Sequence, residues 1–283
     1  MAGSQIIDSD NYGASGIETL FFPGGEPHAK IPDSVAGDVL LFLKLRSWEQ
    51  AGFGACVIDA LSRNRKVSRL DVFIPYFPGA RQDRSDGCAP LTVKLLADLL
   101  TRNRATVYVF DAHSHILPEL APVHVFMPTD LEVPVQPDVV GIIAPDRGAV
   151  ARANSFRNRF YPLASLIQCS KLRDPSSGRL SRYQMPALER PGRFIIVDDI
   201  CDGGGTFNLL ADEFKKGRDP QKFQLELFVS HGIFSKGLDA IDPTITHITT
   251  TDSWFGAGLP ENNRLTVLSL APLFEVIRGH SNA

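Results

Sequence analysis

The sequence predicts an α/β protein made of two doubly wound domains, each with a parallel β-sheet between helices. Short apolar runs alternate with stretches of helical spacing, polar residues follow most of these runs, and the whole pattern pauses and restarts midway. A chain of 283 residues suits two domains, and its 43% hydrophobic and 22% charged content supports a globular core rather than disorder.

The first half predicts strands at residues 39–43, 72–75 and 107–110, with helices at 49–63 and 92–102. The strands are continuous apolar runs, as expected of parallel strands that are covered on both faces. Proline, valine and glutamine at residues 134–137 interrupt the pattern like a linker. We therefore expect domains at residues 1–136 and 137–283.

The second half repeats the alternation. Strands are expected at 139–144, 194–197, 223–230 and 245–249, and helices at 149–158, 207–216 and 270–278. In open parallel sheets, ligands bind beyond the carboxyl ends of the strands. The polar residues that follow the predicted strands should therefore gather at that edge; they are Asp111, His113, Asp146, Asp198, Asp199, His231 and Asp252.

Composition limits the classes of function. The formal net charge of −3 argues against nucleic-acid binding through bulk electrostatics. Four cysteines without a CxxC pair are typical of reduced thiols. The first residues lack a basic segment followed by an apolar one, and no apolar run nears the roughly 20 residues that span a bilayer. We expect a cytoplasmic protein without membrane or nucleic-acid partners.

One segment carries the clearest chemistry. An apolar strand is followed by Asp198 and Asp199 and then by a glycine-rich turn that opens a helix. Glycines allow a close backbone approach, and amides at a helix start bind phosphate. The paired acids would repel phosphate and suit ribose hydroxyls or a magnesium ion. The plainer alternative is a strand-to-helix turn capped by Asp202. The expected phosphate loop is Asp202, Gly203, Gly204, Gly205 and Thr206.

This segment resembles the ribose-phosphate loop of the type I phosphoribosyltransferase fold. Further segments, in matching order, resemble the ribose-phosphate diphosphokinases; they are residues 74–84, 111–113, 144–148 and 230–235. The resemblance implies an enzyme that moves the β,γ-diphosphate of ATP to the anomeric hydroxyl of ribose 5-phosphate. Asp198 and Asp199 would then hold the ribose, and the glycine loop its 5-phosphate.

The resemblance also implies an ATP site. Arg81 and Gln82 match family positions that hold ATP, although a surface salt bridge would also explain the arginine. Phe22, Gly24, Gly25 and Glu26 resemble a loop that reaches the ATP site of a neighbouring subunit, with Gly24 in place of an aspartate. A plain glycine turn with a buried phenylalanine is the alternative.

Metal and catalytic residues are implied in the same way. His113 and Asp146 match the family's Mg²⁺ ligands, with His115 as a neighbouring alternative. Histidine is an unusual ligand for so hard a cation. Lys171 and Arg173 match a Lys-x-Arg pair on a mobile loop, where cations would stabilise the charge on the transferred phosphates. A solvated basic loop is the alternative reading.

Other acceptors and roles stay open. A loop with three glycines could admit a phosphodiester, so ADP-ribose is an alternative acceptor and NAD salvage an alternative pathway. A phosphoribosyltransferase and a non-catalytic regulatory relative are two further alternatives. The resemblance also implies a homo-oligomer, either a dimer or a hexamer.

Overall fold

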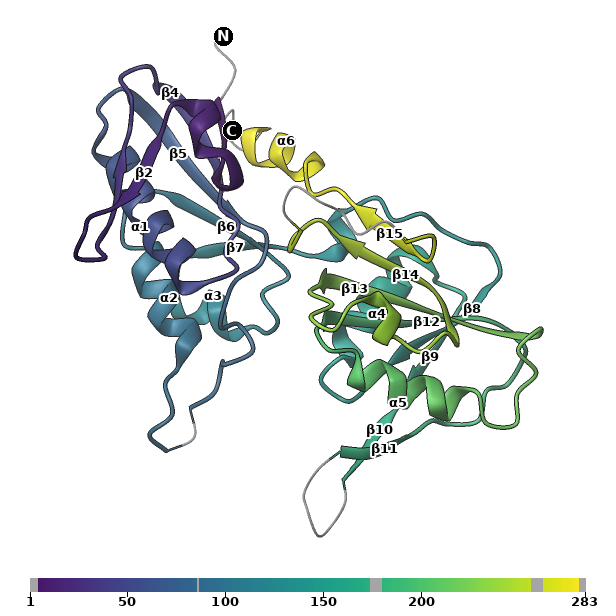
Figure 1. The fold of residues 1–283 in the computed structure, drawn as a ribbon. Helices are drawn as coiled ribbons and strands as arrows, with labels where there is room; N and C mark the ends of the chain where they lie inside the picture. The colour runs from purple at the N-terminus through teal and green to yellow at the C-terminus, as the bar shows by residue number, and fades with distance from the viewer. Residues whose placement is uncertain (1–4, 86, 174–179, 256–261, 280–283) are drawn as a thin grey trace. The chain divides into compact units, whose positions relative to one another are not determined.

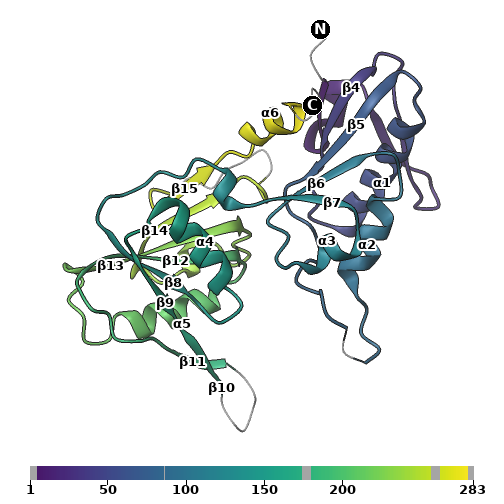
Figure 2. The same ribbon diagram turned by 180° about the vertical axis from the view of Figure 1, so that it is seen from behind.

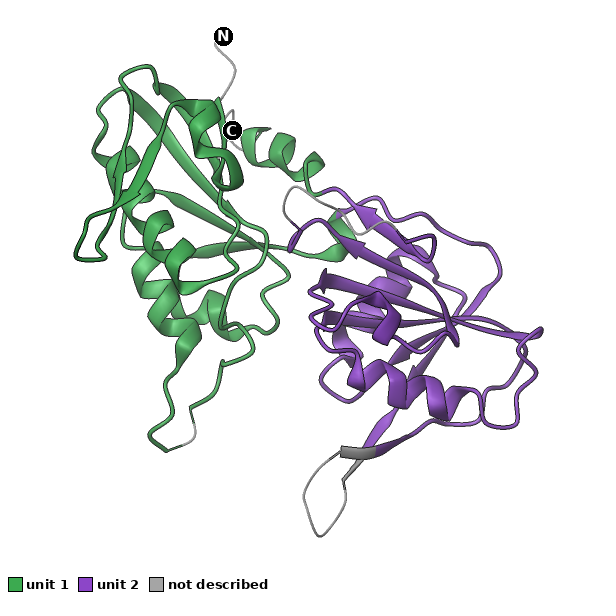
Figure 3. Ribbon diagram, in the orientation of Figure 1, with its two compact units in different colours: residues 1–130, 270–283 green, residues 131–269 purple. Residues whose placement is uncertain are grey.

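The computed structural model describes residues 5–85, 87–173, 180–255 and 262–279, apart from the side chains of residues 172, 173, 180 and 181. The chain divides into two compact units, which are residues 1–130 with 270–283 and residues 131–269 (Figure 3). Each unit has its own parallel sheet with helices on both faces (Figures 1 and 2). This arrangement confirms the predicted fold class.

The first unit is built on a five-stranded sheet with the order β1-β4-β5-β6-β7. All its pairs are parallel. The strands are β1 (Gln5–Asp8), β4 (Gly37–Phe42), β5 (Val67–Ile74), β6 (Thr106–Phe110) and β7 (Val123–Phe126). The helices are α1 (Trp48–Arg63), α2 (Thr92–Leu100), α3 (Ile116–Leu120) and α6 (Pro272–Gly279), and short 3₁₀ turns cover Ser9–Ser15 and Pro128–Asp130.

The side-chain alternation along β4 and β5 determines which helix covers which face. Leu41 and Val72 belong to the core that also contains buried residues of α1, α2 and α3. Phe42 and Phe73 instead contact Phe274 of α6, with ring centroids 4.9 and 6.0 Å apart. Both faces are therefore covered, as the continuous apolar runs predict.

Helix α1 begins where the sequence provides a cap. Ser47 has extended backbone geometry, and its hydroxyl accepts a hydrogen bond from the amide of Gln50 at 3.2 Å. The Gln50 side chain in turn accepts from the Arg46 amide at 2.6 Å. A separate antiparallel ribbon, β2 (Glu18–Phe21) with β3 (Pro27–Lys30), packs against this helix through Phe21 and Phe53.

The second unit is built on a six-stranded sheet with the order β15-β14-β13-β12-β8-β9, again entirely parallel. Its strands are β8 (Val139–Ala144), β9 (Ser165–Gln168), β12 (Gly192–Cys201), β13 (Phe223–Gly232), β14 (Ile245–Thr251) and β15 (Leu265–Leu268). The helices are α4 (Val150–Phe160) and α5 (Gly205–Phe214), with a 3₁₀ turn at Leu238–Ala240. An antiparallel hairpin joins β10 (Ser170–Arg173) to β11 (Leu180–Gln184).

The two helices cover opposite faces of this sheet. Ile196 packs in one core with Phe207 and Leu210 of α5, whereas Val197 packs in another with Phe156 of α4. Tyr183 of β11 is buried in the α5 core, so the hairpin is anchored on that side of the sheet.

The unit boundaries differ from the expected ones. The division falls after Asp130, six residues before the expected boundary at 136, and the segment from Leu270 onward clusters with the first unit. The reason is packing, since α6 places Phe274 against Phe42 and Phe73 of the first sheet. Arg69 of β5 also donates to the carbonyl of Ile277 at 3.3 Å.

Among the residues that the structure describes, no helix is both long and apolar enough to cross a membrane.

Candidate active site

The glycine loop lies between β12 and α5, as predicted, but with different limits. The strand continues through Asp198 and Asp199 to Cys201 because β13 extends beside it, pairing Asp198 with Val229 and Cys201 with Gly232. The helix begins at Gly205, two residues earlier than expected. Its cap is Gly204 rather than Asp202, so the alternative of an Asp202 cap is wrong.

Gly204 needs to be glycine for two reasons. Its φ of +75° lies in the left-handed region, which side chains disfavour. A Cβ at this position would also stand 2.3 Å from Cδ1 of Ile241. The turn is therefore fixed by close packing between the loop and the segment that precedes β14.

The loop presents unused hydrogen-bond donors. The backbone amides of Gly203, Gly205 and Thr206 have no acceptor among the described residues, whereas those of Phe207 and Asn208 both donate to the Gly204 carbonyl. The amide of Gly204 faces the buried sulfur of Cys201. Free amides at the positive end of a helix dipole form an anion site. The arrangement suits a phosphate.

Two acids stand just before this loop. Asp199 is buried, and its amide donates to Oδ1 of the partly buried Asp198 at 3.0 Å. Burial and the adjacent Asp199 carboxylate raise the pKa of Asp198 to about 7, against the opposing charge of Arg152 in α4. Below that pH the pair carries one proton and can both donate to and accept from sugar hydroxyls.

Asp146 and Lys171 form an ion pair in the second unit. Lys171 Nζ in β10 lies 2.5 Å from Oδ2 of Asp146, which follows β8. The other carboxylate oxygen, Oδ1, accepts from the amides of Gly148 and Ala149 at 2.8 and 3.2 Å. Burial alone would raise the pKa of Asp146, but the contact with Lys171 and the two amides outweigh it and lower that pKa.

For Arg173, the second predicted cation, the structure describes only the backbone. Arg173 pairs with Leu180 at the end of the β10–β11 hairpin. Its side chain lies outside the described part of the structure, so its role stays a prediction.

The predicted ATP residues of the first unit lie in a tight turn after β5. Phe77 and Ala80 are buried in the core, whereas Arg81 and Gln82 are exposed beside them. Gly79 has a φ of +77°, and its carbonyl accepts from the amide of Gln82 at 2.8 Å. The apolar residues of this motif thus anchor a turn that presents its polar side chains to solvent.

His113 follows β6 in a strained turn. His113 has a φ of +65° and Asp111 a φ of +41°, and neither is glycine. The His113 amide donates to the Asp111 carbonyl at 2.8 Å, while the Asp111 amide is held by the carbonyl of Phe126. Backbone strain of this kind is typical of functional sites. His115 is the N-cap residue of α3, is exposed, and lies 3.8 Å from the carboxylate of Glu119.

The turn between β2 and β3 contains the remaining predicted residues. Phe22 is 50% exposed, so the alternative of a buried phenylalanine is wrong. Its amide donates to the carbonyl of Glu26, and Gly25 has a φ of +92°. A Cβ on Gly24 would stand 2.7 Å from Oε2 of Glu26, so an aspartate there would push against that carboxylate.

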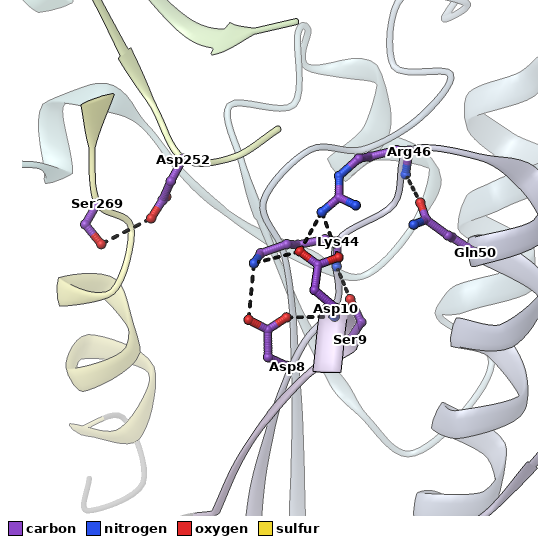
Figure 4. A network of polar contacts seen from close by, with 8 residues as sticks. All are labelled: Asp8, Ser9, Asp10, Lys44, Arg46, Gln50, Asp252 and Ser269. Carbon is purple, nitrogen blue, oxygen red and sulfur yellow. Dashed lines mark hydrogen bonds and ion pairs between the residues drawn. The ribbon is translucent and has the colours of Figure 1, made fainter. Parts of the chain in front are cut away.

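A charged network joins the loops after β1 and β4, which the strand-end pattern did not predict (Figure 4). Arg46 contacts Asp10 at 2.6 Å, and Lys44 lies 3.2 Å from Asp8 and 3.1 Å from Asp10. The two acids balance the two bases, so this network stabilises the loops. In the second unit, the same view shows the Ser269 hydroxyl donating to Asp252 at 3.2 Å.

Two side chains lie near the phosphate loop although the sequence around them does not predict that position. Lys236 lies over Gly203, so that a Cβ there would stand 3.3 Å from the lysine Cε. Tyr183 approaches Thr206 from the hairpin. Both come from segments distant in sequence, and only the fold brings them to the loop.

One carboxylate of the second unit, Asp146, is suited by its chemistry to a magnesium ion that takes its other ligands from elsewhere. Among the described residues, no three His, Cys, Asp or Glu side chains are grouped as a metal cage. Mg²⁺ is commonly bound by one or two carboxylates, with waters and substrate phosphates filling the other positions. Asp146 can offer Oδ2 once Lys171 moves away from it.

Comparison with known proteins gives one consistent result. Residues 133–263 match the phosphoribosyl transferase domain family. The chain is 30% identical to the ribose-phosphate pyrophosphokinase of Maricaulis maris, over 95% of this chain and 89% of that protein. It is 28% identical to the protein of the same name from Hyphomonas neptunium, over 94% and 88%.

A solved structure shares the whole fold. The crystal structure of phosphoribosylpyrophosphate synthetase from Mycobacterium smegmatis superposes with a TM-score of 0.72 at 20% identity, covering 98% of this chain and 99% of that one. Both units therefore have counterparts in a single known chain.

Proposed function

Because the chain belongs to the ribose-phosphate pyrophosphokinase family, we propose that it transfers the β,γ-diphosphate of ATP to the anomeric hydroxyl of ribose 5-phosphate, giving phosphoribosyl diphosphate and AMP. The observation that carries this proposal is the loop after β12, where the amides of Gly203, Gly205 and Thr206, which have no acceptor in the described part of the chain, follow two acids. Phosphate and ribose hydroxyls are complementary to these two features.

The residues of the second unit would position the acceptor sugar. The loop amides bind its 5-phosphate, and Asp198 and Asp199 accept hydrogen bonds from its ribose hydroxyls. The anomeric oxygen then attacks the β-phosphorus of ATP, the bond from that phosphorus to the α,β-bridging oxygen breaks, AMP departs, and the hydroxyl proton is released. Such a displacement depends on position and charge rather than on covalent catalysis.

Cations are required where charge accumulates on the transferred phosphates. Lys171 is suited to this task, with Arg173 two residues later on the same strand. Lys171 must leave Asp146 to reach a phosphate. Arg81 and Gln82, with Phe22, Gly24, Gly25 and Glu26, are proposed to bind ATP.

We propose Mg²⁺ as the metal that accompanies ATP. His113 of the first unit and Asp146 of the second are each proposed as a metal ligand, and a bound ion would neutralise phosphate charge. The strained turn at His113 and the carboxylate of Asp146 support this proposal.

The acceptor is the least constrained part of the proposal. The glycine at 205 has open space around it, but Lys236 fills the space beside Gly203. The loop is therefore less open than three glycines alone would predict. We therefore favour ribose 5-phosphate as the acceptor, and the assay below also tests ADP-ribose.

One assay distinguishes these functions. The purified protein is incubated with ATP and Mg²⁺ and with either ribose 5-phosphate or ADP-ribose, and the products are identified by mass spectrometry. We expect AMP and phosphoribosyl diphosphate in equal amounts with ribose 5-phosphate only. AMP release only with ADP-ribose would reassign the acceptor. If neither acceptor gave AMP, the protein would not be a diphosphokinase, and the phosphoribosyltransferase and the non-catalytic regulatory protein would be the two alternatives left.

We also propose that the chain forms a homo-oligomer. The support is an exposed apolar group on the β2–β3 ribbon and at the start of α1, comprising Leu20, Phe21, Phe22 and Trp48. Light scattering coupled to size-exclusion chromatography would test this, and a monomer at micromolar concentration would contradict it.

A further inference from the structure

Tyr183 is buried beside the candidate phosphate loop. It is 1% exposed, the largest of the fully buried side chains, and its ring packs in the core that contains Phe207 of α5. Its hydroxyl oxygen is buried without a hydrogen-bond partner among the described residues. Because a buried hydroxyl without a partner is unfavourable, its persistence here needs an explanation.

The nearest partner for that hydroxyl is Thr206. Tyr183 packs in the core with Phe207, the residue after Thr206, and the neighbouring Thr206 side chain lowers the pKa of the phenol. The Tyr183 hydroxyl nevertheless makes no hydrogen bond to it in the free protein. Burial is the larger influence and raises that pKa, so the phenol stays protonated and can donate. Thr206 belongs to the first turn of α5, and its own amide has no acceptor.

The hairpin connects this tyrosine to the catalytic side of the site. Tyr183 is the direct antiparallel partner of Lys171 in the register of β10 and β11. The charges of Lys171, Asp146 and Asp198 all act on the phenol. The register therefore holds the tyrosine on the strand beside Lys171, and its phenol is within electrostatic range of the ion pair that Lys171 makes with Asp146.

We propose that Tyr183 is a positioning residue for the phosphate loop, whose hydroxyl donates to Thr206 Oγ1 when the acceptor's phosphate binds. This inference rests on the proposed function. A threonine hydroxyl has one proton and rotates freely. Once its oxygen accepts from Tyr183, that proton is directed to the phosphate, and the buried phenol gains a partner. In the free protein the Tyr183 ring is already in place, and the hydrogen bonds from Tyr183 to Thr206 and from Thr206 to the phosphate form when the ligand binds.

The substitution Tyr183→Phe tests this with two opposite effects. It removes the hydroxyl and keeps the ring. We expect the free protein to melt at the same temperature or higher, because an unpartnered group is lost. We expect KM for ribose 5-phosphate to rise about tenfold, because the Thr206 hydroxyl is then no longer oriented for its own hydrogen bond to the charged phosphate, with KM for ATP within twofold. A lower melting temperature, or an unchanged KM for ribose 5-phosphate, would overturn the proposal.

A double-mutant cycle separates positioning from packing. In a Thr206→Val background the tyrosine has no hydroxyl to orient, so adding Tyr183→Phe should raise KM by less than twofold. Additive effects of the two substitutions would overturn the proposal. Tyr161→Phe is the matched control, since the Tyr161 hydroxyl accepts from the Gln136 amide at the C-terminal end of α4, and it should leave KM unchanged. A wild-type protein that forms no AMP with ribose 5-phosphate would instead refute the proposed function.

Discussion

Lys171 Nζ and Asp146 Oδ2 lie 2.5 Å apart, so the predicted catalytic lysine and a predicted metal ligand neutralise each other in the ligand-free protein. The contact explains how a lysine and a carboxylate can share a partly buried site without isolated charges. If Lys171 and Asp146 have the proposed roles, nucleotide binding must separate them before either can act.

Replacing Lys171 by alanine should therefore affect turnover far more than folding. We expect kcat to fall about 10²- to 10³-fold, the usual cost of removing one group that stabilises transition-state charge. KM for ribose 5-phosphate should change less than threefold. Steady-state assays of AMP release would measure both constants.

A surface lysine provides the control for that substitution. Lys222 is 68% exposed and pairs only loosely with Asp219, at 3.6 Å. Lys222→Ala should keep the wild-type kcat. If Lys171→Ala retained more than a tenth of the wild-type kcat, the lysine would not be catalytic.

The glycines of the phosphate loop should differ sharply in their tolerance of a side chain. Gly204→Ala places a Cβ against Ile241 and forces a left-handed φ, so we expect a loss of about 2–4 kcal/mol in the free energy of unfolding. Gly205→Ala meets no atom within 4 Å and has a helical backbone, so it should keep the wild-type stability. Chemical denaturation of both variants measures the difference, and equal stabilities would contradict the loop geometry described here.

The pKa of Asp198 predicts how the protein responds to pH. If the ionised carboxylate accepts from ribose hydroxyls, kcat/KM for ribose 5-phosphate should rise with pH to about 7 and then level. Asp199→Asn removes the neighbouring charge, so the rising limb should move to lower pH. A limb that stays in place in this variant would show that another group titrates.

The same shift affects stability with a definite sign. The folded pKa of Asp198 lies above its ordinary value of 3.8, so folding favours the protonated form. Its contribution to stability is complete below about pH 4 and is lost as pH rises to about 7. Asp198→Asn should therefore flatten the fall in stability between those values, which urea denaturation at several pH values would show.

Much of the fold was predictable because local sequence determines it. Continuous apolar runs such as residues 39–43 and 139–144 indicate strands covered on both faces, and glycines between a strand and a helix indicate a phosphate loop. The end of strand β12 was harder, because Asp198 and Asp199 are polar, and the strand continues past them through the pairing of Asp198 and Cys201 with β13. Long-range pairing of this kind leaves no mark in the local pattern.

The missed parts of the candidate site are contacts between distant segments. Tyr183 and Lys236 reach the loop at residues 202–206 from the hairpin and from the segment after β13, and neither lies in a motif that the sequence alone singled out for phosphate. The return of α6 to the first unit is also tertiary, since an amphipathic helix can pack on any complementary apolar face. Pattern and spacing identify such elements but not their partners.

Lys236 supplies the last prediction, which concerns the acceptor phosphate. Its aliphatic chain lies over Gly203, and its ammonium group makes no ion pair with the described residues, so the charge is available to a phosphate held by the loop. Lys236→Ala should raise KM for ribose 5-phosphate about two- to fivefold, as expected for an exposed charge pair. The effect should shrink as salt rises from 50 to about 500 mM, because exposed charges are screened. Lys216→Ala, which removes an exposed lysine paired with Glu213, should leave KM unchanged at either salt concentration. An equal response of the two variants would mean that Lys236 only packs against the glycine and does not bind the phosphate.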